Sequence, residues 1–412
     1  MFSPTEFRNP YRPGAGHMPP HLAGRESQRH EFERLLDQDV ILENAVITGL
    51  RGVGKTVLLE TLKPTAVSKG WLWVGTDLSE SASATEDNLA IRLLADLSVV
   101  TSQVVVRQRI PPGFGESSSP RTQALDYQTL TAIYVGTPGL LEDRLKVLLE
   151  QAWQRLQPQG HRGLIFAYDE AQHLSDNAAR DQFALSVLLD VFQSLQRRNL
   201  PLMLVLSGLP TLFPKLVQAR TFAERMFHII TLGKLGQADV HKAIDKPLND
   251  ADHPSPVRFT NNAVDVIAKE SGGYPYFIQF ICREAFDAHL QQLKTGATPA
   301  GVPMEAITHK LDTDFFAGRW SRASDRQRQL LWVISQLPTS DSEFTVQEIV
   351  QRSAELLPRP FGGSNVNQML AVLCDHDLIY KNRHGRYSFA IPLLDQFVRR
   401  QSQPGTFAPE TS

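Results

Sequence analysis

The stretch "GLRGVGKT", residues 49–56, decides the fold of this chain. Gly49, Gly54, Lys55 and Thr56 match the pattern G-x-x-x-x-G-K-[ST], which here lies between an apolar, strand-like run, "AVIT", and a helical pattern. The glycines let the backbone curl so that successive N–H groups point at phosphate oxygens, and the helix that begins near Lys55 adds its positive end. The alternative is a glycine-rich turn that matches by chance. The flanking strand and helix favour phosphate binding.

This loop predicts a site for ATP and Mg²⁺. Lys55 is expected to reach the β- and γ-phosphates, and Thr56 to place its hydroxyl on the metal ion. The other predicted nucleotide contacts come from the rest of the loop and from the first turn of the helix, namely Gly49, Leu50, Arg51, Gly52, Val53, Gly54 and Val57.

Two acids, Asp169 and Glu170, follow the buried run "LIFAY". Beside a phosphate loop, an acid at a neighbouring strand end holds the Mg²⁺ shell, and a second acid orients and deprotonates the attacking water. We therefore predict Asp169 as a metal ligand and Glu170 as the catalytic base. The alternative is that the pair only caps the next helix, where acids are favoured. Ser207, in "LSGLP", is predicted to sense the γ-phosphate through that water. The alternative is that this stretch is only a simple turn before Pro210.

Apolar runs alternate with helical patterns as far as residue 232, which is typical of βαβ units and a mostly parallel sheet. The segment "QRIPPGFGESSSPRTQ" (108–123) is rich in Pro, Gly and Ser and predicts an exposed loop. The predicted strands cover residues 45–49, 71–79, 163–170 and 200–210, and the predicted helices residues 24–38, 55–70, 85–100, 140–156 and 183–198.

The last part of the chain has another pattern. Residues 233–310 show only helical patterns, and three further helix candidates are followed by a hairpin with a glycine-containing turn, the outline of a winged helix-turn-helix. Such a module suggests duplex DNA as a partner. The predicted recognition helix, "SNVNQMLAVLCDHD", has no Lys or Arg and offers Asn365, Asn367 and Gln368 to base edges. The alternative is a protein-docking module. Cations gather on the predicted wing and beyond it: Lys381, Arg383, His384, Arg386, Arg399 and Arg400.

The composition excludes several classes of protein. The formal net charge of −2 on 412 residues gives no global attraction to nucleic acid or anionic lipid. The two cysteines, Cys282 and Cys374, argue against a disulfide framework and favour a reduced, cytoplasmic protein. The first residues have no secretion-signal pattern, and no apolar run is long enough to cross a membrane.

Five motifs together carry a family resemblance: "GLRGVGKT", "YDEAQHL", "LSGLP", "FAERMF" and "SGGYPYFIQF", in this order. They resemble the AAA+ ATPases, in particular bacterial ATP-binding proteins related to the archaeal and eukaryotic replication-initiator (origin-recognition) ATPases and near the STAND NTPases. The resemblance covers most of residues 10–400.

The resemblance implies further site residues. Gly24 and Arg25, in "PPHLAGRE", would lie by the adenine, and an arginine before the last strand, Arg225 or else Arg220, would reach the γ-phosphate bound by a neighbouring subunit. Pro275 would contact the nucleotide in a closed state, as in STAND switches. The resemblance also shows one departure. Where AAA+ proteins often carry a lid arginine this chain has Tyr276, and Arg283 is the nearest substitute.

The expected fold is α/β, a P-loop NTPase core of the AAA+ type with a helical lid and a C-terminal winged helix. The expected function is Mg-ATP binding and hydrolysis coupled to conformational change, with self-assembly or a protein partner and with duplex DNA as a further partner. The alternative is a slowly hydrolysing, STAND-like switch that recruits proteins. The expected boundaries are an arm (1–21), the core (22–232), the lid (233–312), the winged helix (313–400) and a tail (401–412).

Overall fold

The computed structural model describes residues 8–75, 77–79, 85–102, 105–108, 121–249, 255–299, 301–383 and 385–401. The chain divides into two compact units. The first unit consists of residues 1–24, 50–54 and 233–412, and the second of residues 25–49 and 55–232.

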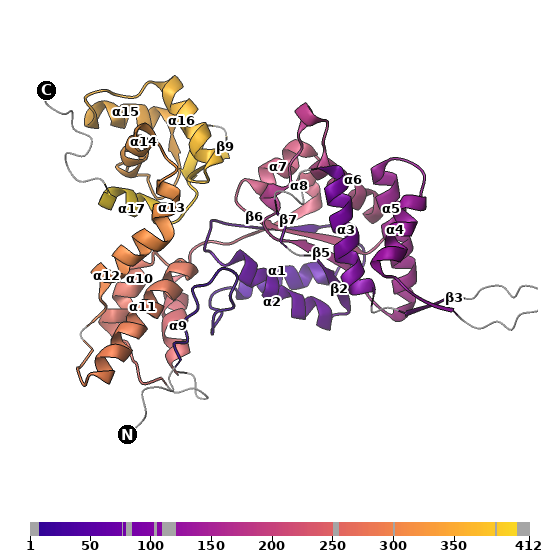
Figure 1. Ribbon diagram of the computed structural model, residues 1–412, viewed down its shortest axis with the longest axis horizontal. Coiled ribbons are helices and arrows are strands. Elements are labelled where there is room, and N and C mark those ends of the chain that lie inside the picture. Colours follow the sequence, from indigo (N-terminus) through magenta and orange to yellow (C-terminus); the bar gives the residue numbers. More distant parts are fainter. Residues whose placement is uncertain are drawn as a thin grey trace, which may run out of the picture. The chain divides into compact units, whose positions relative to one another are not determined.

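The second unit is built on a parallel five-stranded sheet in the order β2-β5-β6-β1-β7. The three inner strands, β5, β6 and β1, are buried throughout, as expected of a parallel sheet covered by helices, and the edge strands β2 and β7 are partly exposed. Figure 1 shows α1 and α2 on one side of the sheet and α6 and α7 on the other. The strands are β1 (Asn44–Thr48), β2 (Trp71–Val74), β5 (Gly163–Tyr168), β6 (Leu202–Gly208) and β7 (Phe227–Thr231).

Eight α-helices belong to the described part of the second unit. Thr85 begins α3 because its side chain accepts a hydrogen bond from the backbone N–H of Asn88, and Asp126 begins α4 in the same way through Thr129. The helices are α1 (Glu26–Leu36), α2 (Lys55–Ser68), α3 (Glu86–Thr101), α4 (Tyr127–Gly136), α5 (Leu141–Leu156), α6 (Ala184–Gln196), α7 (Leu212–Ala219) and α8 (Ala223–Met226).

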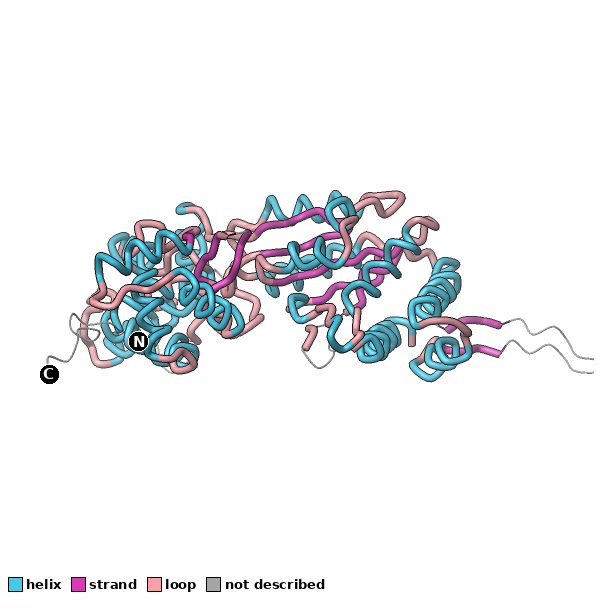
Figure 2. Tube along the Cα trace, turned by 90° about the horizontal axis from the view of Figure 1, so that it is seen from above, coloured by secondary structure: helices cyan, strands magenta, loops and turns pink. Residues whose placement is uncertain are grey.

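Part of the segment that was predicted as a loop forms a separate hairpin. Strands β3 (Val105–Gln108) and β4 (Arg121–Ala124) pair antiparallel, and they lie apart from the five-stranded sheet (Figure 2). Residue 108 and residues 121–123 were predicted as loop and are strand instead. Cross-strand pairing here joins residues that are 13 to 19 positions apart in the chain, from Gln108 with Arg121 to Val105 with Ala124, which local composition does not reveal. The middle of the predicted loop lies outside the described residues.

Between residues 237 and 320, the described residues of the first unit form helices joined by loops, with no strand among them. Tyr11, from the beginning of the chain, is buried in its core, where the phenol donates a hydrogen bond to the carbonyl of Ile244 and the ring packs edge-on against Phe286. The helices are α9 (Gln237–Asp245), α10 (Asn261–Glu270), α11 (Pro275–Lys294), α12 (Met304–Leu311) and α13 (Ala317–Trp320), with a π-helical turn, η6 (Asp312–Phe316), joining the last two.

The C-terminal module, residues 325–401, completes the first unit. The three predicted helices and the hairpin are present, and β8 adds a third antiparallel strand, in the order β8-β10-β9. Thr345 and Glu348 form a capping box that begins α15. The elements are α14 (Asp325–Ser335), β8 (Phe344–Thr345), α15 (Val346–Leu356), α16 (Gly363–Asp375), β9 (Ile379–Arg383), β10 (Arg386–Phe389) and α17 (Leu394–Gln401), of which β8 and α17 were not predicted.

Candidate nucleotide site

The first part of the site is a direct contact between the phosphate loop and the acidic pair. Strands β1 and β5 run parallel on either side of β6, so the residues that follow them meet at the carboxyl edge of the sheet. There the hydroxyl of Thr56, in the first turn of α2, donates a hydrogen bond to the carboxylate of Asp169. Asp169 is only 2% exposed. Two residues that the sequence predicts as metal ligands are therefore adjacent.

Lys55 begins α2 and is held close to the loop. Its ammonium group donates a hydrogen bond of 3.0 Å to the carbonyl of Gly49, and the residue is buried. Gly54, just before it, has φ +92°, a conformation that costs an L side chain about 1–2 kcal/mol. The loop therefore needs glycine here for its backbone shape, since a Cβ at Gly54 would meet no atom within 4 Å.

Glu170 follows Asp169 with an unusual backbone. It has φ +53° and ψ +32°, and its backbone N–H donates a hydrogen bond of 2.9 Å to Oδ1 of Asp169. Its carboxylate accepts a hydrogen bond from the side-chain amide of Gln172. The side-chain oxygen of Gln172 also accepts a hydrogen bond of 3.2 Å from the backbone N–H of Leu209, which follows the end of β6. Gln172 therefore fixes the predicted catalytic base, a role that the sequence analysis missed.

Ser207 lies inside β6 between β5 and β1, paired in register with Ile47. The residue is fully buried, and its hydroxyl has no hydrogen-bond partner among the described residues. An unpaired buried hydroxyl is costly, and such groups gather at functional sites. This is the position from which the sequence predicts contact with the γ-phosphate through water.

Asp77 is a further acid at this edge that the sequence analysis missed. It forms an isolated parallel bridge with Asp169, beyond the end of β2. Burial raises the pKa of the Asp77 carboxyl, and the neighbouring charges of Asp169 and Glu170 raise it further. The signal was present in the sequence, because an acid soon after the apolar run "WLWV" belongs to the same sheet edge as Asp169.

These residues fit Mg²⁺. The ion prefers oxygen ligands and usually combines one or two protein groups with phosphate oxygens and water. Thr56 and Asp169 offer a hydroxyl and a carboxylate in contact with each other, and the carboxylates of Asp77 and Glu170 add negative charge close by.

The tip of the loop, residues 50–54, belongs to the first unit. Arg51 forms an ion pair of 2.8 Å with Asp377. The carbonyl of Gly52 accepts a hydrogen bond of 3.1 Å from the backbone N–H of Tyr276, in the first turn of α11. Pro275 occupies the first position of that helix, where its missing N–H costs nothing. The predicted nucleotide contact Pro275 therefore lies next to the residue that holds the loop tip.

Gly24 and Arg25, predicted to lie by the adenine, directly precede α1. Gly24 has φ +64°, and a Cβ there would lie 2.8 Å from the carboxylate of Asp239, so a larger residue at this position would be strained. Arg25 is buried at the N-cap position of α1. Arg283, the predicted substitute for the missing lid arginine, is exposed on α11, and its carbonyl accepts 2.9 Å from Asn9.

The two candidate arginines have different surroundings. Arg220 is held in an ion pair with Asp190, whereas Arg225 is exposed and its side chain makes no hydrogen bond or ion pair with any described residue. Arg225 precedes β7 and lies at the amino edge of the sheet, while the phosphate loop follows β1 at the carboxyl edge. It lines an open cavity of about 360 Å³ together with Val40, Leu42, Gln193, Arg197, Phe222 and Met226.

The cations of the C-terminal module are partly used within the chain. Arg400 binds Asp312 through two nitrogens, at 3.0 and 2.5 Å, and Arg399 donates to the carbonyl of Ser335 and the hydroxyl of Ser340. Lys381 is exposed. His384 lies outside the described residues, as does the side chain of Arg383.

The comparisons with known proteins agree with the observed fold. Residues 21–206 match the model of the AAA ATPase domain family. These residues form an AAA+ ATPase domain. Residues 313–398 match the model of a domain of unknown function, DUF8462. A search of curated proteins found no match to the chain.

Solved structures share the fold over most of this chain. The Walker-type ATPase PABY2304 of Pyrococcus abyssi is 15% identical, with a TM-score of 0.57 over 92% of this chain and 96% of that one. The ORC2 protein of Aeropyrum pernix, in its ADP form, is 14% identical, with a TM-score of 0.52 over 94% of this chain and 97% of that one. The predicted α/β fold of the AAA+ type is therefore confirmed. No helix in the described part of the chain is both long and apolar enough to cross a membrane.

Proposed function

We propose that this chain is an Mg²⁺-dependent ATPase that converts ATP and water to ADP and phosphate. The observation that carries the proposal is the hydrogen bond between Thr56 and the buried carboxylate of Asp169, which places the phosphate loop and the acidic pair at one edge of the sheet. Because metal-dependent phosphoryl transfer needs a hydroxyl, a carboxylate and a base in one place, this contact supports catalysis beyond nucleotide binding.

Each residue then has a role. Lys55 and the loop amides bind the phosphates, and Thr56 and Asp169 hold the metal ion. Bound Mg²⁺ supplies positive charge against the phosphate oxygens. Glu170 takes the proton of the attacking water, and Ser207 orients that water. Three residues hold the rest of the nucleotide: Gly24, Arg25 and Pro275.

We place the last catalytic group on a second copy of the chain. Arg225 lies at the opposite edge of the sheet from the phosphate loop of its own chain, and the five residues of β1 separate the edges by about 16 Å at a rise of about 3.3 Å per residue. An arginine side chain does not cross that distance. Its exposed guanidinium is available to the γ-phosphate bound by a neighbouring copy, where it would stabilise the transition state.

Phosphate release from ATP tests the proposal. Lys55→Ala and Glu170→Gln are expected to abolish Mg²⁺-dependent release, while Lys63→Ala, an exposed lysine on the same helix α2, leaves it unchanged. Equal rates in Lys55→Ala and wild type would overturn the proposal. Size-exclusion chromatography with and without Mg-ATP tests assembly, which is expected only with nucleotide.

A second candidate function is a slowly hydrolysing switch that recruits protein partners. Two observations favour it: the carboxylate of Glu170 is already bound by Gln172, and Tyr276 stands where a lid arginine is common and bonds the loop tip. A pull-down decides this. Partners retained by Glu170→Gln with ATP, lost with Lys55→Ala and unaffected by nuclease would support the switch.

Duplex DNA is a further proposed partner of the C-terminal module. The order of its helices and its hairpin supports this, whereas the internal bonds of Arg399 and Arg400 reduce the cations available for phosphate contacts. Fluorescence anisotropy with a labelled duplex at low salt tests it. Binding that ATP strengthens and salt weakens is the expected result, and an unchanged anisotropy would reject DNA as a partner.

A further inference from the structure

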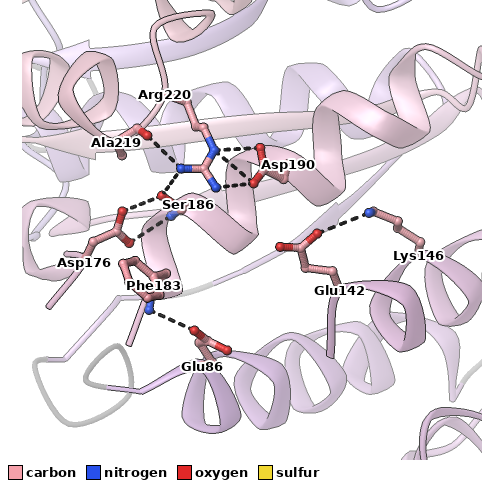
Figure 3. Close-up of polar contacts among 9 residues, drawn as sticks. All are labelled: Glu86, Glu142, Lys146, Asp176, Phe183, Ser186, Asp190, Ala219 and Arg220. Carbon is pink, nitrogen blue, oxygen red and sulfur yellow. Dashed lines mark hydrogen bonds and ion pairs between the residues drawn. The ribbon is translucent and has the colours of Figure 1, made fainter. Parts of the chain in front are cut away.

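Arg220, at the end of α7, is held by five hydrogen bonds (Figure 3). Its Nε donates to both carboxylate oxygens of Asp190, at 2.9 and 3.0 Å, and Nη2 donates to one of them at 2.5 Å. Nη1 donates to the hydroxyl of Ser186 at 2.7 Å and to the carbonyl of Ala219 at 2.9 Å. The hydrogen bonds to Asp190 raise the pKa of Arg220, so the guanidinium stays charged.

The partners of Arg220 are themselves fixed. Ser186 is buried, and its hydroxyl donates to Asp176 at 2.5 Å while its backbone N–H donates to the same carboxylate at 3.0 Å. The start of α6 is also bound to α3, because the backbone N–H of the N-cap residue Phe183 donates a hydrogen bond of 2.9 Å to the carboxylate of Glu86 (Figure 3). The side chains that bind Arg220 therefore belong to a helix, α6, that is itself held by hydrogen bonds to the rest of the unit.

A short segment joins Arg220 to Arg225. The N–H of Ala223 donates 3.0 Å to the carbonyl of Arg220, and the N–H of Arg225 donates 3.0 Å to the carbonyl of Phe222. At the other end, the carbonyl of Met226 accepts 3.2 Å from the side chain of Asn44, which is fully buried in β1. The backbone that carries Arg225 is thus held on both sides, at Arg220 and at Asn44.

We propose that Arg220 is a positioning residue for Arg225. This inference rests on the proposed function, in which Arg225 acts on the γ-phosphate held by a second copy. Arg220 touches no nucleotide in this proposal. Its guanidinium fixes the end of α7 to α6, and this attachment sets the place from which Arg225 extends. The fork shape makes this attachment firmer, because a lysine at this site would make single hydrogen bonds in place of the paired ones.

Kinetics on the full chain give the first test. Arg220→Ala is expected to lower kcat about 10- to 100-fold, since a misplacement of about 1 Å has such an effect, while KM for Mg-ATP changes less than about twofold. Arg220→Lys is expected to recover part of kcat. Arg198→Ala is the matched control, because Arg198 pairs with Glu150 on the surface and is 55% exposed. A normal kcat in Arg220→Ala, or an equal effect on KM, would overturn the inference.

Mixed assemblies separate this role from a general loss of structure. Glu170→Gln has a dead site and an intact arginine segment, whereas Arg220→Ala has an intact site and a displaced arginine segment. Mixing the two is expected to give more activity than the two measured apart, as is mixing Glu170→Gln with Arg225→Ala. If the mixture with Arg225→Ala recovers activity and the mixture with Arg220→Ala does not, Arg220 acts within its own subunit or only on folding, and the inference is overturned.

Hydrogen exchange provides a readout that does not depend on hydrolysis. Arg220→Ala is expected to exchange faster over residues 220–226 and at the wild-type rate in β1 and α2. Unchanged exchange over that segment would overturn the inference even in an inactive protein. Failure of the proposed function looks different: wild type and Arg198→Ala would both release no phosphate, or Arg225→Ala would be as active as wild type.

Discussion

Thr56 and Asp169 lie 113 residues apart in the chain and share a hydrogen bond at the carboxyl edge of the five-stranded sheet. The hydroxyl is the donor and the buried carboxylate is the acceptor. The same two groups are those that we propose for Mg²⁺, so the fold already brings the proposed metal ligands into contact.

Thr56→Val tests this contact because valine keeps the shape and removes the hydroxyl. Asp169 then loses a partner while it stays buried, and we expect the free energy of unfolding to fall by about 1–3 kcal/mol. Mg²⁺-dependent phosphate release is expected to disappear. Urea denaturation and a phosphate assay measure the two effects. Thr56→Ser keeps the hydroxyl and is expected to retain both properties; an equal loss in Thr56→Ser would show that the methyl group, not the hydroxyl, matters.

Ser207→Ala is expected to separate stability from activity. The serine hydroxyl is buried without a partner among the described residues, so its removal relieves a desolvation cost of about 1–3 kcal/mol. We expect the variant to unfold at higher urea concentration than wild type and to release phosphate more slowly. A destabilised Ser207→Ala protein would mean that the hydroxyl is bonded in solution.

Asp77→Asn is expected to stabilise the nucleotide-free protein at neutral pH. Folding raises the pKa of Asp77, through burial first and then through the charges of Asp169 and Glu170. A raised pKa means that the folded state binds the proton more tightly, so the contribution of Asp77 to stability is greatest below its ordinary pKa and is lost as the pH rises through the raised value. The asparagine variant removes that loss. Its advantage in melting temperature is therefore expected at pH 7 and to shrink as the pH is lowered toward 4, and a constant advantage would exclude titration of Asp77 as the cause.

The ion pair between Arg51 and Asp377 is expected to be weak. The two side chains are 29% and 49% exposed, and pairs of this kind contribute about 0–1 kcal/mol. A double-mutant cycle with Arg51→Ala and Asp377→Ala, followed by urea denaturation, measures the coupling, which is expected to fall further in 0.5 M salt. A coupling well above 1 kcal/mol would show that the pair is shielded from water more than its exposure indicates.

The sequence was informative wherever a pattern is local. The phosphate loop, the buried strand before Asp169 and the alternation of strands and helices all depend on nearby residues, and the fold that they predict is confirmed. Gln172 and Asp190 could not be assigned in this way, because their roles depend on contacts with Glu170 and Arg220 that only folding creates. Strand β4 was missed for the same reason. The domain boundaries and the role of each site residue stay predictions.

The location of Arg225 has a consequence for how such a protein would behave in a dilute solution. The phosphate loop and the exposed arginine lie at opposite edges of one sheet. If Arg225 acts on a second copy, as we propose, each polypeptide carries one half of each of two sites and no complete site. ATP turnover per molecule would then rise with protein concentration and be lost on dilution, even though every copy stays folded and bound to ATP. Abundance in the cell would itself act as the control of its chemistry.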